Sequence, residues 1–323
     1  HLKSRDQFLF GLDDGSIQIV DNKLKRTTDK LQKQDDGAGG VVSMLISPNE
    51  SFVAIGTSRG YLKIFDLTTN KNLFSSKIGA FSIEKLLWSK EADQLYLTCG
   101  KLLFHIKINN FELFEYASHP STVTGLKHLN ENLVGTTSYS ELRLFENSVQ
   151  NPYQTFEWKG SLTSLDFTPD EKFAVCTAQD MSIHLWDLDR GKDLAMNGFP
   201  AKVKSVSFSQ RGNKMACDSA DYILVWDFSG KGPAGRKPKM SQQLPEKIDK
   251  VLYSPKDDTL VSLLKDGVIL FWNDEQSLEV PTHIAGIKDA QTISLDFSKD
   301  GQSLVATLHN NYAAIYNLKT GRM

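Results

Sequence analysis

The 323-residue sequence contains few cysteines: Cys99, Cys176 and Cys217 are the only three. An odd number of widely spaced cysteines argues against a disulfide framework and favours a reducing compartment. Each of the three lies within or at the end of a run of β-forming residues, where a free cysteine behaves as a small hydrophobic side chain. We therefore expect buried thiols in a cytoplasmic protein.

The sequence also lacks long hydrophobic runs and an excess of charge of either sign. No stretch approaches the roughly 20 apolar residues that a membrane helix needs, and no signal peptide is visible. The 37 basic and 39 acidic residues give a net charge of −2, so bulk electrostatics predicts neither a nucleic-acid-binding nor a membrane-surface protein. We expect no membrane partner.

Motifs for catalysis and metal binding are missing as well. No two of the seven histidines have the i, i+4 spacing of a helical zinc site, and no Cys-x-x-Cys accompanies them. The sequence contains neither a G-x-S-x-G nucleophile elbow nor a G-x-x-x-x-G-K-S/T phosphate loop. We therefore predict a protein that is not an enzyme and has no catalytic residues, cofactor or metal.

What the sequence does contain is a repeated unit. Its clearest copy, residues 173–188, is a β-run, a polar turn at Gln179-Asp180 and a second β-run that ends in Trp186-Asp187. The residues that end the eight copies are Asp21, Asp66, Lys107, Glu146, Asp187, Asp227, Asn273 and Asn317, each 39 to 46 positions after the one before. A further β-run with alternating apolar residues precedes each copy except the first, and a sheet packed between two neighbours requires that alternation.

A strand–turn–strand unit with this period and a Trp-Asp ending resembles the WD40 repeat of β-propellers. The resemblance covers essentially the whole chain, although only two copies keep a literal Trp-Asp and none has the Gly-His pair that often opens a repeat. It implies four-stranded antiparallel blades around a central channel and a role in protein binding. We predict an all-β fold, a single WD40-type β-propeller domain over residues 1–323 with seven or eight blades, eight being favoured. Both termini are expected to be trimmed.

The recurring aromatic residues and turn aspartates have structural explanations. Trp186 and its counterparts stand at the same phase of their units, which indicates packing between blades. Asp180, Asp221 and Asp266 lie in hairpin turns, where aspartate side chains accept hydrogen bonds from nearby backbone amides.

The hairpin turns and the links between units are expected to share one face, and loops on a rigid scaffold commonly carry function. Aromatic and basic residues at exposed positions are typical binding anchors. The predicted partner-binding residues are Arg59, Tyr139, Tyr222 and Lys265 in turns and Phe81, Trp158, Lys159, Phe199 and Lys202 in links. The alternative is that several of the aromatic side chains pack beneath loops.

The sequence favours a non-catalytic scaffold that binds a protein or peptide on the propeller face within a larger complex. One alternative is a small-molecule or metal-dependent enzyme that uses the central channel. Another is an RNA-associated scaffold, because the Lys231–Met240 insert carries the basic residues Lys231, Arg236, Lys237 and Lys239 and leaves a nucleic-acid partner open.

Overall fold

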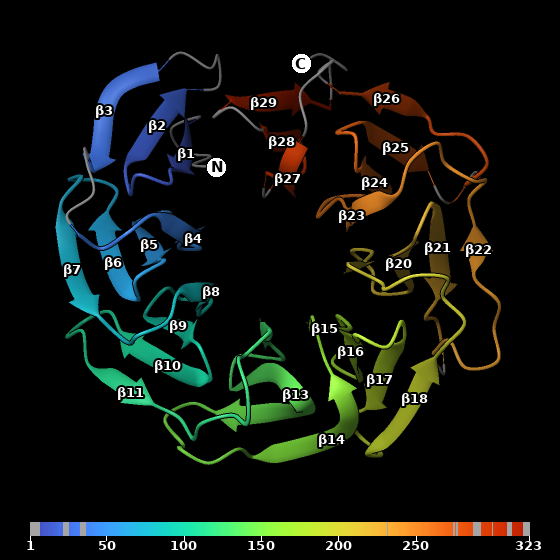
Figure 1. The fold of residues 1–323 in the computed structure, drawn as a ribbon, viewed down its shortest axis with the longest axis horizontal. Coiled ribbons are helices and arrows are strands. Elements are labelled where there is room, and N and C mark those ends of the chain that lie inside the picture. Colours follow the sequence, from blue (N-terminus) through green and yellow to red (C-terminus); the bar gives the residue numbers. More distant parts are fainter. Residues whose placement is uncertain are drawn as a thin grey trace. The chain divides into compact units, whose positions relative to one another are not determined.

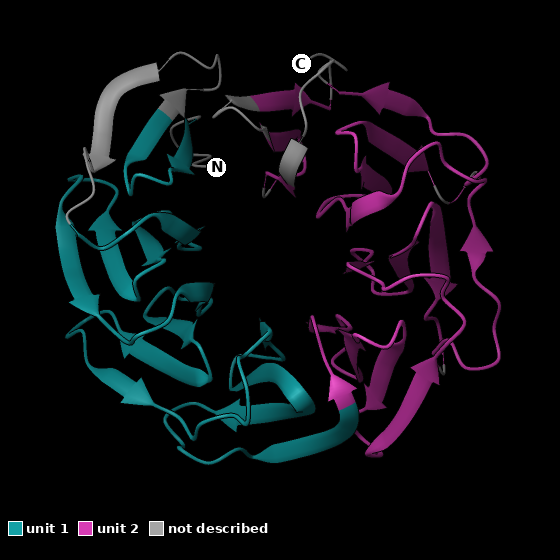
Figure 2. Ribbon diagram, viewed as in Figure 1, with its two compact units in different colours: residues 1–159 teal, residues 160–323 magenta. Residues whose placement is uncertain are grey.

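The computed structural model describes residues 7–21, 26–32, 37–230, 232–273, 275, 277–286, 292–298, 300–308 and 312–318. Every regular element in these residues is a β-strand, and none of them belongs to a helix that could cross a membrane. The chain divides into two compact units, residues 1–159 and 160–323 (Figure 2). The single domain over residues 1–323 stays a prediction.

The first unit contains four antiparallel sheets (Figure 1). Their strands are β1 (Gln7–Gly11), β2 (Ile17–Asp21) and β3 (Arg26–Gln32); β4 (Val41–Ile46), β5 (Phe52–Thr57), β6 (Tyr61–Asp66) and β7 (Asn72–Lys77); β8 (Ile83–Trp88), β9 (Gln94–Cys99), β10 (Leu102–Lys107) and β11 (Leu113–Glu115); and β12 (Gly125–His128), β13 (Leu133–Glu146) and β14 (Gln154–Ser161). The end of β14 passes the boundary between the units by two residues.

The second unit contains four sheets of the same kind (Figure 1). Their strands are β15 (Asp166–Phe167), β16 (Phe173–Thr177), β17 (Ile183–Asp187) and β18 (Lys192–Met196); β19 (Val206–Phe208), β20 (Lys214–Ser219), β21 (Tyr222–Asp227) and β22 (Lys239–Met240); β23 (Ile248–Tyr253), β24 (Thr259–Leu264), β25 (Ile269–Asn273) and β26 (His283–Ala285); and β27 (Thr292–Phe297), β28 (Ser303–Leu308) and β29 (Tyr312–Asn317).

Each predicted repeat corresponds to one sheet, and the strands of every sheet are hydrogen-bonded in chain order. Such up-and-down antiparallel sheets are the blades of a β-propeller, so the predicted all-β propeller class is confirmed, with eight blade sheets in the described residues. The fourth sheet differs locally. Its strand β13 continues through the predicted turn, with Ser140 at a φ of 65°.

The hydrophobic core lies between adjacent sheets. In one cluster, Leu62 and Ile64 of β6 pack with Ile83, Leu97 and Phe104 of the next sheet. In the second unit, β17 and β20 meet in the same way. The central strands are therefore buried on both faces: five of the six residues of β9 are buried. Each sheet gains much of its stability from its neighbours, because burial of apolar area is the main favourable term in folding.

Two predictions about side chains are confirmed by this packing. All three cysteines are free and buried. The recurring aromatic side chains Phe65, Phe145, Trp186 and Phe271 are at most 4% exposed, whereas Trp226 is half-buried. Among the turn aspartates, Asp266 accepts a hydrogen bond of 3.1 Å from the amide of Val268.

The turn before β6 depends on a glycine. Gly60 has a φ of 79°, and a Cβ at this position would lie 2.2 Å from the carbonyl oxygen of Gly79. Left-handed backbone at a residue other than glycine costs about 1–3 kcal/mol, and here the clash adds to that cost. Only glycine fits where this turn meets the link that follows β7.

We expect Gly60→Ala to lower the urea midpoint of unfolding more than Gly191→Ala, as followed by tryptophan fluorescence. Gly191 is the matched control because its φ is 64° but no heavy atom lies within 4 Å of an added Cβ. Equal midpoints for the two variants would contradict the close approach at Gly60.

Candidate functional site

The hairpin turns and the links between sheets are joined by backbone hydrogen bonds within each unit. In the first unit, the amide of Ser58 donates to Gly40 at 2.9 Å and that of Val123 to Gly100 at 2.9 Å. In the second, the amide of Lys265 donates to Lys247 at 2.8 Å. The predicted sharing of one face by turns and links therefore holds inside each unit.

The turn-and-link surface of the first unit consists of the turns 58–60, 100–101 and 139–140 and the links 37–40, 78–82 and 117–124. Three predicted anchors lie exposed on it. Arg59 donates from Nη1 to the carbonyl oxygen of Gly37 at 3.1 Å. Phe81 is 65% exposed and Tyr139 is 55% exposed. The amide of Tyr139 donates to Ser121 Oγ at 2.9 Å, which ties this turn to the link that precedes β12.

Phe81 is held in place although most of its surface is exposed. Its ring lies against Gly100, where an added Cβ would come within 2.7 Å of Phe81 Cδ2. Its carbonyl oxygen accepts a hydrogen bond of 3.1 Å from Cys99 Sγ and would lie 2.7 Å from a Cβ at Gly60. The link that carries Phe81 therefore packs against two glycine turns.

Trp158 and Lys159 occupy a different place from the one predicted. Both lie inside strand β14, the outer strand of its sheet, and not in a link. Lys159 is exposed, whereas Trp158 is half-buried. The outer strand continues to Ser161, so the link is shorter than the spacing of the repeats suggests.

The second unit holds the other four predicted residues. Phe199 is only 8% exposed and packs beside Val203, so the alternative of packing beneath a loop holds for this side chain. Lys202 donates from Nζ to Gln179 Oε1 at 2.7 Å, again joining a link to a turn. Tyr222 is half-buried at the start of β21, and Lys265 is exposed in its turn.

A buried carboxylate fixes the link before β19. Asp218 is 1% exposed, and its carboxylate accepts hydrogen bonds from the amides of Lys204 and Ser205 at 2.9 and 2.8 Å. Burial raises the pKa of Asp218 to about 6, although these hydrogen bonds oppose the rise. The ammonium group of Lys204 pairs with Asp249.

One histidine of this surface has a role that the sequence reading missed. His119 lies in the link before β12 and is 2% exposed. Its Nε2 lies 2.8 Å from Thr136 Oγ1, and its Nδ1 lies 3.2 Å from the carbonyl oxygen of Lys101. Burial lowers the pKa of His119 to about 4, so it is neutral at pH 7. The pair Ser118-His119 lies near the start of its repeat, where the sequence analysis looked for Gly-His. A search for histidine alone at that position would have found His119.

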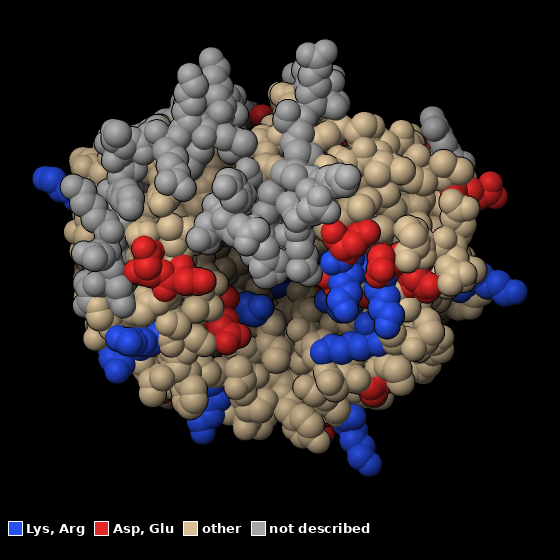
Figure 3. Space-filling view, turned by 45° about the horizontal axis from the view of Figure 1, so that its top comes forward, with Lys and Arg blue, Asp and Glu red and all other residues tan. Residues whose placement is uncertain are grey.

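The basic insert makes contacts of its own. Lys231 lies outside the described residues. Arg236 folds back to Asp227, with Nη1 and Oδ2 2.5 Å apart, and donates to Ser229 Oγ at 3.0 Å. On the face in Figure 3, basic and acidic side chains lie among one another. Neither the insert nor this face presents the broad positively charged surface that nucleic-acid binding favours.

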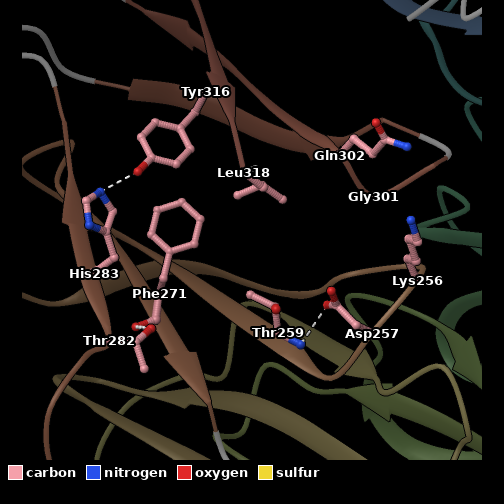
Figure 4. A pocket seen from close by; sticks show the side chains of 10 residues that line it. All are labelled: Lys256, Asp257, Thr259, Phe271, Thr282, His283, Gly301, Gln302, Tyr316 and Leu318. Carbon is pink, nitrogen blue, oxygen red and sulfur yellow. Dashed lines mark hydrogen bonds between the residues drawn. The ribbon is translucent and has the colours of Figure 1, made fainter. Parts of the chain in front are cut away.

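A pocket of about 360 Å³ lies in the second unit between the last two sheets (Figure 4). Phe271, His283 and Tyr316 gather at one end, where the Tyr316 hydroxyl bonds to His283 Nε2. Lys256 and Asp257 lie at the other end. The lining contains one histidine and no cysteine or serine. In the described part of the chain, no group of three or more His, Cys, Asp and Glu side chains is placed to hold a metal ion.

Comparison with known proteins adds to this picture. Residues 150–187 match the family model described as "WD domain, G-beta repeat". The chain carries a WD40 repeat. This segment includes Trp186-Asp187 of the clearest copy, and together with the blade sheets it confirms the resemblance to WD40-repeat propellers.

Curated relatives of this chain include proteins named "Eukaryotic translation initiation factor 3 subunit I". The Drosophila grimshawi protein is 23% identical over 175 residues, which are 50% of this chain and 52% of that protein. The Drosophila mojavensis protein is 26% identical over 176 residues, or 49% and 52% of the two chains. The chain thus spans about half the length of the curated relatives it matches.

The buried carboxylate of Asp218 gives a test of how the link is held. A folded-state pKa raised from 3.8 to about 6 means that the folded state favours the protonated acid, so stability falls as the pH rises through that interval. At 1.36 kcal/mol per pKa unit, Asp218→Asn should raise the free energy of unfolding at pH 8 by about 2–3 kcal/mol.

The asparagine oxygen can still accept both amide hydrogen bonds, so the link should remain in place. Urea unfolding of the wild type and of the variant should show this difference in free energy at pH 8. At pH 4 the two free energies of unfolding should be nearly equal. A difference that does not change with pH would contradict the raised pKa of Asp218.

Proposed function

We propose that the chain is a non-catalytic scaffold that binds a protein partner through its turn-and-link surface, inside a multi-subunit assembly. The observation that carries this proposal is the exposure of Phe81 and Tyr139 on turns and links that are tied together by hydrogen bonds. Exposed apolar rings cost free energy in the isolated protein. Their burial against a partner recovers that cost.

The rigidity of the surface supports the proposal. Binding is weakened by the entropy lost when mobile side chains and loops become ordered. Here the carbonyl oxygen of Phe81 already lies close to Gly60, and its ring lies close to Gly100. An anchor that is ordered before binding loses little freedom, and interface energy is commonly concentrated in a few such aromatic residues.

The partner class follows from the relatives. Because the matched proteins are named as subunits of eukaryotic translation initiation factor 3, we infer that this chain is a subunit of a translation-initiation assembly in the cytoplasm. The WD40 match supports a scaffold role for such a subunit. The other subunits are then its protein partners.

The test is native-level expression of the tagged polypeptide in its own cells, with gradient sedimentation and mass spectrometry of the co-purified proteins. We expect it to sediment as a particle much larger than the 36.2 kDa of this chain. Other subunits of initiation factor 3 should sediment in the same fractions. Migration as a free protein without those subunits would contradict the proposal.

The double variant Phe81→Ala, Tyr139→Ala should reduce the recovered assembly by about tenfold or more, because loss of a binding hot spot costs at least about 2 kcal/mol. Tyr153→Ala is the matched control, since Tyr153 is 63% exposed in the same unit but lies outside the turn-and-link surface. All variants should keep the wild-type urea midpoint. Equal loss of assembly in the control would contradict a role for this surface.

A further inference from the structure

A small pocket opens beside Phe81 on the turn-and-link surface. Its volume is about 90 Å³, and its lining includes Ser82, Glu84, Thr98 and Gly100. Phe81 and Ser82 come from the link before β8, Glu84 from β8, Thr98 from β9 and Gly100 from the turn that follows. Thr122 and Val123 of the link before β12 complete the lining, so segments of two neighbouring sheets build this site, which we call the Phe81 pocket.

The pocket has an aromatic wall. The Phe81 side chain is 65% exposed, and the close approach of Gly100 holds its ring in position. The face of an aromatic ring carries partial negative charge and attracts cations. No lysine or arginine is among the residues that line the pocket.

The pocket also has a carboxylate. Glu84 is exposed, and its Oε1 accepts a hydrogen bond of 2.9 Å from Ser82 Oγ. No basic side chain in the described residues pairs with it. The pocket thus presents negative charge next to the ring of Phe81, and both features favour a positively charged group.

The third feature is a hydroxyl that is open to the pocket. Thr98 is 3% exposed, and its Oγ1 forms no hydrogen bond within the described residues, although the residue lines the pocket. The hydroxyls of the buried Thr137 and Thr177 instead bond to neighbouring hydroxyls at 3.1 and 2.8 Å. Thr98 Oγ1 can therefore accept a hydrogen bond from a donor that enters the pocket.

We propose that the Phe81 pocket binds an arginine side chain of the protein partner. The planar guanidinium group stacks on aromatic rings and carries five N–H donors in a fixed arrangement. It can contact the ring of Phe81 while it donates to Glu84 and Thr98 together. The compact ammonium group of lysine makes the ionic contact but not the stacking. This inference rests on the proposed scaffold function, whose partner chemistry it specifies.

The experiment uses the full chain and three small probes: the N-acetyl amides of L-arginine, L-lysine and L-citrulline. Saturation-transfer NMR detects weak ligands and gives a dissociation constant by titration. Citrulline keeps the shape of arginine but is uncharged. We expect saturable binding of the arginine probe, weaker binding of the lysine probe and at least tenfold weaker binding of the citrulline probe. No arginine binding, or equal binding of citrulline, would overturn the proposal.

Three variants locate the site. Phe81→Ala and Glu84→Gln should each weaken the arginine probe about tenfold, and Tyr153→Ala should leave it unchanged. Thr98→Val should weaken binding, because it removes a hydroxyl that accepts a hydrogen bond from the guanidinium group, and it should leave the urea midpoint of the free protein unchanged. Unchanged binding of the arginine probe by a Thr98→Val protein that keeps the wild-type midpoint would contradict the role assigned to Thr98.

The outcome is separable from that of the scaffold test. If the arginine probe fails to bind but the Phe81, Tyr139 double variant still loses its assembly, the scaffold stands and the pocket assignment fails. If the probe binds with the expected variant pattern but the protein is found alone in cells, the pocket stands and the scaffold function fails.

Discussion

Burial of each sheet against the next is the constraint on which the structure depends. Strands such as β9 are buried on both faces, so their apolar side chains need a neighbouring sheet on each side. A single isolated sheet with apolar side chains on both faces would expose them to water, which is unfavourable. Repeat architectures solve this problem by stacking, and each repeat is then stabilised mainly by its contacts with the adjacent ones. The regular spacing of the sequence units follows from that requirement.

The same constraint separates the scaffold from the surface it displays. Core positions are fixed by packing, whereas turns and links only have to connect strands, so their side chains can serve binding. Backbone contacts at Gly60 and Gly100 then hold the displayed link in one arrangement. Phe81 is the clearest example, because its large aromatic side chain stays exposed although its link packs closely against two turns.

The sequence predicted the blades well because alternation and period are local signals. It placed strand pairs such as β16 and β17 correctly, including the turn at Gln179-Asp180. It failed where the answer depends on neighbours in space. Trp158 lies in an outer strand instead of a link, and Phe199 is buried beside Val203. The position of Thr98 in the lining of the Phe81 pocket leaves no trace in the sequence, because a pocket is formed by residues from separate segments.

Hydrogen–deuterium exchange of the free chain and of its purified assembly tests whether the turn-and-link surface of the first unit is an interface. We expect slower exchange in the assembly for residues 78–82, 98–101 and 117–124, with little change in the outer strand β11. Unchanged exchange in those three segments, with protection confined to outer strands, would contradict this expectation.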